Sequence, residues 1–379
     1  MTVWLFVVQF GLQNKKIPCN LAFDQKSQVK YSFFITTLLL ILWDSDVEAQ
    51  IGGLQTFDFL NLVSTARSTA LASYPIAAED DDIGQGYINP ALINDKTRNH
   101  LSINHNFHFA DISHGFAAFG FQVEQWKTDV MIGLNYVSYG QFTRADFFGN
   151  NTGEFSGSSA ALTLGFSRQL DERLRAGLNV KYANSSLDTY SASGLGFDFG
   201  FHYRNEDSLT DWALVFKNIG GQLSGFNDDT EAFPMEIQLG FAKRLKHLPF
   251  QFMITAVQLQ RWDLRNPLDD NSNTLFIDQP SNEPSSFSKG IDNFFRHLTF
   301  GGELFIGANE VVRLRLGYNH LRNKELSVSG FRSLSGFSFG FGIRVKKLRF
   351  DYGVGRYHLG GAVNHLSLSI DLDSFFDKL

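Results

Sequence analysis

Apolar and polar residues alternate with a period of two through most of the chain after about residue 100. Segment 195–203, for example, reads Leu-Gly-Phe-Asp-Phe-Gly-Phe-His-Tyr, and segments 174–182, 312–319 and 337–345 repeat the pattern. Because successive side chains of a strand point to opposite faces, each segment has one apolar face and one polar or small face. The segments run for about 9–11 residues, which suits a tilted transmembrane strand better than the shorter strands of a soluble sandwich.

This alternation predicts an all-β fold, a 14-stranded antiparallel transmembrane β-barrel. An even number of strands is expected for a bacterial outer-membrane barrel. The predicted strands lie at 101–109, 115–124, 129–139, 159–168, 173–183, 194–203, 211–218, 236–244, 250–260, 296–306, 311–320, 336–345, 348–357 and 363–372.

The lengths of the predicted connections support a barrel. Connections at one end have about seven residues or fewer, whereas most of those at the other end are longer, with short exceptions at 110–114 and 358–362. Short periplasmic turns and long outer loops are typical of outer-membrane barrels, so we expect the long connections to be surface loops. These predicted loops are 140–158, 184–193, 219–235, 261–295 and 321–335.

An apolar run near the N-terminus predicts a secretory signal peptide. A lysine precedes the run 31–43, and Val47-Glu48-Ala49 has the small-x-small form of a signal-peptidase site. The run is too short for a membrane-spanning helix, which takes about 20 residues. We expect cleavage after Ala49, so that the mature chain begins at Gln50. The residues ahead of the signal reflect either a start codon assigned too early, with Val29 as the true start, or a long leading region.

Residues 50–98 do not alternate and are predicted to fill the barrel as an N-terminal plug. Their apolar spacing suits one or two short helices, followed by an acidic turn at 80–82 and the segment Asn89, Pro90, Ala91. A barrel of this size needs a plug if its lumen is to be closed. We therefore divide the chain into an extension with signal peptide at 1–49, a plug at 50–98 and an outer-membrane barrel at 99–379.

The composition of the chain argues against several kinds of functional site. The chain has 39 Phe and 34 Gly residues but a single cysteine, Cys19, which lies ahead of the predicted cleavage site. Disulfides, cysteine nucleophiles and cysteine–zinc sites are therefore excluded from the mature chain. The net charge is −6, without a long block of like charge, so no nucleic-acid-binding stripe is indicated. We expect no cofactor.

Two motifs that suggest chemistry have simpler explanations. Residues 336–340 match the G-x-S-x-G nucleophile pattern, but that motif needs a strand-to-helix turn, and here alternation begins and continues. We expect Ser338 to be a small residue facing the lumen and the protein not to be an enzyme. The acidic clusters at 80–82 and 269–271 offer ligands for Ca²⁺, but solvated acidic turns account for them as well, and we expect no metal site.

Several blocks of sequence carry a family resemblance. They lie at 50–53, 59–62, 135–143, 152–156, 216–220, 234–240 and 245–249. Together they resemble the PorQ family of outer-membrane proteins of the type IX secretion system. More broadly, the strand number and the plug with Asn89, Pro90 and Ala91 resemble the FadL-like barrels, in which a hatch with an Asn-Pro-Ala element occupies the lumen. Phe375 and Phe376 are followed by three residues, whereas many outer-membrane barrels end on an aromatic residue, which leaves the end of the last strand open.

The resemblance implies a place in the attachment complex of type IX secretion. PorQ-like barrels hold a soluble PorZ-like surface protein next to a PorU-like sortase and a PorV-like barrel. That complex attaches secreted cargo to anionic lipopolysaccharide. The resemblance implies no catalytic residue.

The first functional hypothesis is a non-enzymatic outer-membrane scaffold whose outer loops dock the soluble partner. Mixed charges on the predicted lumen faces favour it, because paired charges can pin a plug. The alternative is a FadL-like transporter of hydrophobic small molecules, which would prefer an apolar interior. A third hypothesis, an outer-membrane lipase, needs Ser, His and an Asn or Asp to converge. The candidate docking residues, for which packing within the loops is the competing explanation, are Phe147, Phe148, Phe226 and Trp262.

Overall fold

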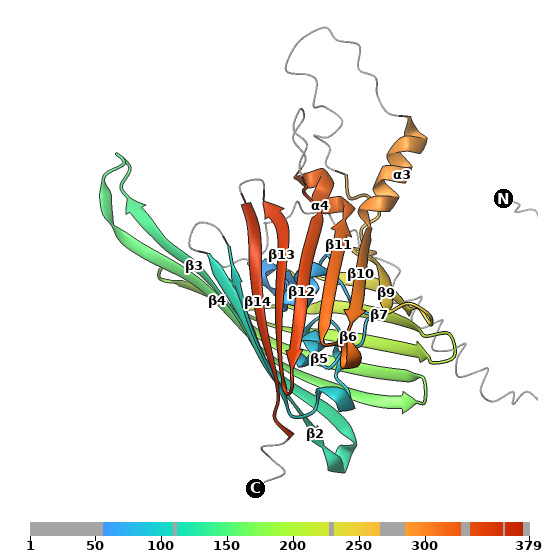
Figure 1. Cartoon of the computed structure of the whole chain (residues 1–379). Coiled ribbons are helices and arrows are strands. Elements are labelled where there is room, and N and C mark those ends of the chain that lie inside the picture. The colour runs from blue at the N-terminus through green and yellow to red at the C-terminus, as the bar shows by residue number, and fades with distance from the viewer. Residues whose placement is uncertain are drawn as a thin grey trace, which may run out of the picture. The chain divides into compact units, whose positions relative to one another are not determined.

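A computed structural model describes residues 56–108, 112–226, 231–265, 285–326, 334–358 and 361–373. Within them, fourteen strands close into one antiparallel barrel, in which β1 pairs with β14 (Figure 1). This confirms the predicted fold class. The strands are β1 (His100–Phe107), β2 (Ser113–Val123), β3 (Thr128–Ala145), β4 (Asn151–Asp171), β5 (Leu174–Leu187), β6 (Tyr190–Asn205), β7 (Thr210–Ser224), β8 (Glu236–Arg244), β9 (Phe250–Ala256), β10 (Leu298–Ile306), β11 (Val312–Asn319), β12 (Phe337–Val345), β13 (Leu348–His358) and β14 (Gly361–Asp371).

Some predictions concern residues near the two ends of the chain that the structure does not describe. The predicted signal peptide and the cleavage site after Ala49 lie outside the described residues. The last strand ends at Asp371, and Phe375 and Phe376 follow outside the described range.

Side chains alternate between the two faces of the barrel wall as the sequence pattern predicts. In β3, Asn135 and Val137 are buried and point inward, whereas Leu134 and Tyr136 are exposed and point outward. The buried inward positions hold many polar, charged and small residues, so the barrel is apolar outside and polar inside. Exposed outward apolar side chains occur around the wall, among them Ile103, Leu162, Tyr182, Phe201, Trp212, Leu239, Leu316, Phe339, Phe350 and Leu368.

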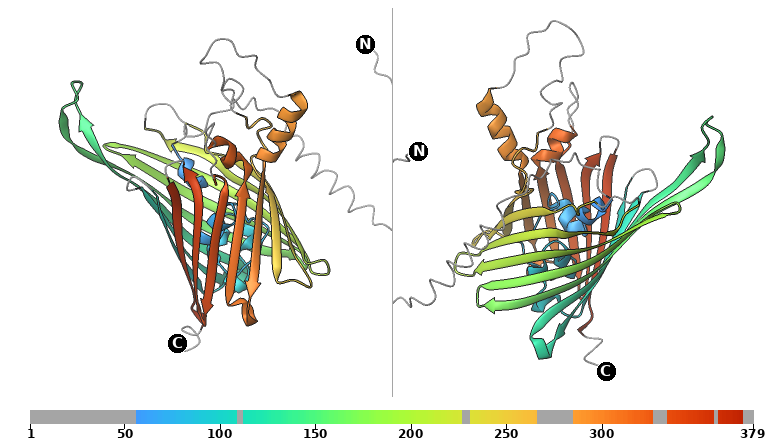
Figure 2. Two further views of the ribbon diagram at one scale, coloured as in Figure 1. Left: turned by 45° about the horizontal axis from the view of Figure 1, so that its top comes forward. Right: turned by 180° about the vertical axis from the view of Figure 1, so that it is seen from behind.

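Residues 56–98, the plug, lie inside the ring of strands, where Figure 2 shows them in blue to cyan. Helix α2 lies against β11–β14, η3 lies against β4–β6, and η2 lies against β1–β4. Among the described helices, none is long and apolar enough to cross a membrane. The plug elements are η1 (Asp58–Asn61), α2 (Ala66–Ala70), η2 (Ile83–Tyr87), η3 (Pro90–Leu92) and η4 (Asp95–Thr97).

Glycines in the wall let the plug backbone approach closely. A Cβ atom at Gly353 of β13 would lie 2.2 Å from the carbonyl oxygen of Ala66, and one at Gly177 of β5 would lie 2.4 Å from the carbonyl carbon of Pro90. These distances are too short for any side chain, so glycine is required where a second backbone comes this near. The wall is therefore shaped to this particular plug on two opposite sides.

Two predicted surface loops are strands instead, so those predictions were wrong. Strands β3 and β4 extend to the five-residue turn 146–150, and β5 and β6 extend to Asp188 and Thr189. The outer parts of β3 and β4 lack apolar alternation because both faces are mostly exposed, whereas backbone pairing between strands needs no apolar side chain.

Of the other predicted loops, 219–235 begins with the end of β7, which runs to Ser224, and two contain helices. The predicted loop 261–295 includes most of α3 (Ser286–Arg296), and the predicted loop 321–335 includes most of α4 (His320–Glu325). The end of the barrel that carries these helices and the β3–β4 turn is termed the loop end. The opposite end, with connections such as 172–173 and 346–347, is termed the turn end.

The close contact at Gly353 predicts a specific loss of stability. Gly353→Ala places a methyl group against the backbone of Ala66, and we expect the free energy of unfolding to fall by about 1–3 kcal/mol. Gly221→Ala in β7 is the matched control, since nothing lies within 4 Å of its added Cβ. Urea unfolding of the detergent-solubilised barrel measures both variants, and equal midpoints would contradict a plug packed against the wall.

Candidate functional site

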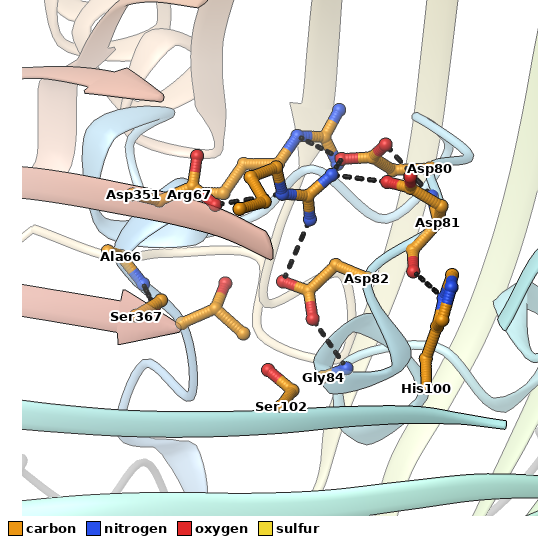
Figure 3. Close-up of polar contacts among 12 residues, drawn as sticks. Ala66, Arg67, Asp80, Asp81, Asp82, Gly84, His100, Ser102, Asp351 and Ser367 are labelled. Carbon is orange, nitrogen blue, oxygen red and sulfur yellow. Dashed lines mark hydrogen bonds and ion pairs between the residues drawn. The ribbon is translucent and has the colours of Figure 1, made fainter. Parts of the chain in front are cut away.

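The plug places three consecutive aspartates against the barrel wall. Asp82 Oδ1 accepts a hydrogen bond from the backbone N–H of Gly84 at 2.9 Å and so caps η2 (Figure 3). Asp80 and Asp82 are buried, and Asp81 is partly exposed. A solvated acidic turn was therefore the wrong expectation for residues 80–82.

Arginines from three neighbouring strands meet this acidic turn. Nη1 of Arg313 in β11 lies 2.8 Å from Asp80 Oδ2, and Nη1 of Arg349 in β13 lies 3.0 Å from the same oxygen. Arg349 and Arg344 of β12 also pair with Asp81. Because an unpaired charge in such a space costs several kcal/mol, the plug supplies the counter-charges that the arginines of the wall require.

Arg67 of α2 extends the network to a second set of wall residues. Its Nη2 lies 2.8 Å from Glu303 Oε2 in β10, and its Nε lies 3.5 Å from Asp80 Oδ2. Glu303 also pairs with Arg315 Nε at 2.8 Å, and Arg315 Nη1 reaches Asp351 Oδ1 at 2.6 Å. All five side chains are buried. The network therefore joins the plug to β10, β11 and β13 through charges that solvent screens little.

Asp80 is the centre of this network and stays ionised. Burial raises the pKa of its carboxyl group, but Arg313, Arg349 and Arg67 outweigh burial and hold the pKa well below its ordinary value. The neighbouring Asp81 behaves in the opposite way, since burial and the charge of Asp80 raise its pKa. Asp80 is therefore the carboxylate on which the attachment of the plug depends most.

A buried ion pair within the wall faces the opposite side of the plug. Lys181 Nζ of β5 lies 2.7 Å from Asp198 Oδ2 of β6, and both side chains are fully buried. The same ammonium group lies 4.4 Å from the ring centroid of Tyr87, whose hydroxyl donates to the carbonyl oxygen of Leu60 at 2.9 Å. A cation–π contact therefore joins the plug to β5 as well.

The predicted plug motif lies against this second side. Asn89 Oδ1 accepts from the N–H of Ala91 at 2.9 Å, and Asn89 Nδ2 donates to the carbonyl oxygen of Ile76 at 2.8 Å. Pro90 occupies the first turn of η3, where its missing N–H is not needed. All three motif residues are buried, and their contacts give them a structural role in shaping the plug.

The candidate nucleophile is also a plug contact. Ser338 Oγ donates to the carbonyl oxygen of Ala70 at 3.1 Å and accepts from the N–H of Ala72 at 3.2 Å. It lies within β12 rather than on a strand-to-helix turn. No cluster of three or more His, Cys, Asp or Glu side chains in the described part of the chain is arranged to hold a metal ion, and the acidic cluster at 269–271 lies outside that part.

The four candidate docking residues have different environments. Phe147, Phe148 and Trp262 lie at the loop end with 99%, 85% and 86% of their surface exposed. Phe226 instead packs, partly buried, against a cluster of plug and wall residues that includes Phe57. Packing within the protein therefore accounts for Phe226 but not for the other three.

The sequence analysis did not predict that the acidic turn, Arg67 and Glu303 attach the plug to the wall. A signal was present, because the predicted lumen faces of 311–320 and 348–357 carry arginines that need counter-charges. The run of aspartates at 80–82 in the predicted plug was a natural source of those charges.

Comparisons with known proteins give structural similarities only. No protein-family model matches the chain, and no curated protein matches it. The toluene transporter TodX of Pseudomonas putida is 12% identical, and the match covers 82% of this chain and 97% of that chain with a TM-score of 0.47. A FadL homologue of Pseudomonas aeruginosa is 11% identical, with coverage of 81% and 98% and a TM-score of 0.45.

A TodX variant, described as a monoaromatic hydrocarbon channel, is 14% identical, with coverage of 83% and 98% and a TM-score of 0.48. None of these three descriptions mentions type IX secretion. With TM-scores below 0.5, the similarities carry no argument about function, and the fold assignment rests on the strand pairing itself.

The network around Asp80 predicts a large effect of a small substitution. Asp80→Asn keeps the shape but leaves Arg313 and Arg349 without their shared carboxylate, and we expect a loss of about 3–5 kcal/mol in the free energy of unfolding. Asp207→Asn is the matched control, because Asp207 is 87% exposed and lies 3.6 Å from Arg173, so its loss should be below about 1 kcal/mol. Equal urea midpoints for the two variants would show that the buried network does not hold the plug.

Proposed function

We propose that this chain is a non-enzymatic barrel of the bacterial outer membrane that anchors a soluble partner at the cell surface. The observation that carries the proposal is the attachment of the plug, which is bound by buried ion pairs to β11 and β13 and by close backbone contacts to opposite sides of the wall. A lumen closed in this way suits an anchor better than a passage.

The outward face of the barrel supports a membrane location. Large apolar side chains are exposed around the wall, whereas the lumen face is polar. Soluble monomers rarely expose continuous apolar surface on this scale, and a closed barrel is one of two architectures that satisfy every backbone hydrogen bond in lipid. The loop end, with the longer connections, then faces the cell exterior, and the turn end faces the periplasm.

The plug supports an anchor because moving it would be costly. Displacement of the plug would separate the wall arginines from Asp80. It would also separate Arg67 of the plug from Glu303 of the wall. Breaking a buried pair by removing one partner costs about 3–5 kcal/mol, and several pairs would break together. A route through the lumen would need another source of counter-charge.

The finer form of the proposal comes from the sequence resemblance. In this form the barrel belongs to the attachment complex of type IX secretion, and a PorZ-like surface protein is its soluble partner. A PorU-like sortase and a PorV-like barrel would be its neighbours, and anionic lipopolysaccharide would receive the cargo. The exposed aromatic residues Phe147, Phe148 and Trp262 at the loop end are consistent with such docking.

Transport of hydrophobic small molecules is the second candidate. Its structural basis is an irregularity in the wall, where the register of β6 and β7 shifts between Phe197 and Phe199 and Asn218 has a φ of 54°. Such a site is where the wall would part most easily to admit an apolar molecule from the side. The N–H of Asn218 donates to Asp198 Oδ1 at 2.8 Å and keeps the irregularity closed, which favours the anchor.

Purification of the tagged full chain from its native outer membrane in mild detergent tests the proposal against transport. We expect a soluble surface protein in near-equal amount, and no faster uptake of toluene by proteoliposomes that contain the barrel than by empty liposomes. A barrel recovered alone, with an apolar molecule bound and with accelerated toluene uptake, would replace the anchor by a transporter.

A further inference from the structure

Strands β3 and β4 continue beyond the barrel as a hairpin, here residues 139–156. Pairing of β3 with β2 ends at Ser138, and pairing of β4 with β5 ends at Gly157. Beyond these residues the two strands pair with each other, from Gln141↔Ser156 onward, and the N–H of Asp188 donates to the carbonyl oxygen of Ser156 at 3.1 Å. Figures 1 and 2 show this hairpin bending away from the barrel wall at the loop end.

The tip of the hairpin is held in one conformation. Asp146 Oδ1 accepts from the N–H of Phe148 at 2.9 Å and from the N–H of Asn150 at 2.8 Å, and Asp146 Oδ2 accepts from Asn150 Nδ2 at 2.9 Å. Gly149 supplies the positive φ of 84° that closes the turn. Phe147 and Phe148 are thereby presented on an ordered turn, with 99% and 85% of their surface exposed.

The stem of the hairpin is braced from one side. The rings of Phe142 and Phe155 stack with centroids 5.3 Å apart, and the guanidinium of Arg144 lies 5.9 Å from the ring centroid of Phe155. Arg144 Nη2 also pairs with Asp188, in the β5–β6 turn, at 2.5 Å. An isolated two-stranded ribbon is marginally stable in water, so these contacts keep the tip at a fixed distance from the barrel.

The face of the hairpin that continues the outer surface of the barrel is polar. In β4 the even-numbered residues point outward, so Glu154 and its partner Thr143 lie on this face, as do Ser156 and its partner Gln141. The outward apolar row of β3 therefore stops at Tyr136. Because this outward face is polar, the hairpin extends beyond the apolar layer of the membrane. This favours a protein over lipid as the partner that the tip contacts.

We propose that this hairpin is the docking element of the barrel, and that Phe147 and Phe148 enter an apolar pocket on a soluble surface protein. The inference rests on the proposed anchor function and assigns it to one element. The hairpin residues include one basic side chain, Arg144, and two acidic ones, Asp146 and Glu154, so the pocket has basic residues at its rim. Aromatic side chains that fill a desolvated pocket dominate the binding energy of many interfaces.

The test compares three forms of the tagged full chain, each purified from its native outer membrane in mild detergent. They are the wild type, the double variant Phe147→Ser/Phe148→Ser, and the matched control Trp126→Ser, which removes an aromatic side chain 61% exposed at the turn end. We expect the double variant to retain at least ten-fold less of the soluble protein than the other two. Heat-modifiable migration on gels checks that all three barrels are folded, and Phe147→Leu/Phe148→Leu should restore recovery.

A photo-reactive phenylalanine analogue at position 147, irradiated in cells, identifies what the tip touches. Cross-linking to the protein that the double variant loses supports the inference. Cross-linking to lipid alone would overturn it in favour of a membrane-surface role. Equal recovery by the double variant would remove the hairpin as the docking element while leaving the anchor function intact, whereas failure of the wild type to retain any soluble protein would remove the anchor function itself.

Discussion

The ion pairs between the acidic turn of the plug and the arginines of the wall are the constraint on which the rest of the structure depends. Arginines at inward positions of β11 and β13 cannot remain in a narrow lumen without counter-charges, and Asp80 provides the carboxylate that both share. The same pairs bind the plug to the strands that form the wall. Attachment of the plug is therefore a condition for the stability of this barrel.

Packing adds a second requirement to the electrostatic one. Glycines such as Gly353 let the plug backbone contact the wall directly, so the close packing leaves no room for a side chain at these positions. Outside the lumen, the structural additions to the barrel lie mainly at the loop end, where α3, α4 and the β3–β4 turn are found. The β3–β4 hairpin is the most prominent of them, and its two exposed phenylalanines stand on a stem that is braced by Arg144 and Asp188.

Much of the fold was predictable because its main determinant is local. Alternation of apolar and polar residues marks a strand wherever one face meets lipid and the other meets the lumen, and it correctly gave a barrel of fourteen strands. The same signal disappears where both faces meet water, so the outer parts of β3 and β4 were mistaken for a loop. The role of Asp80 was missed for a different reason, since it depends on residues more than two hundred positions away. The packing of Phe226 against the cluster that includes Phe57 is equally non-local, and the sequence left it as one of two explanations.

Hydrogen exchange of the plug amides, with the barrel in lipid nanodiscs, tests the central claim most directly. The account predicts that amides of α2, η2 and η3 exchange as slowly as those of β11–β13 and that added toluene leaves their rates unchanged. Rapid exchange confined to the plug, or a large change in its rates with toluene, would contradict a lumen sealed by a fixed plug and would point to a passage that opens.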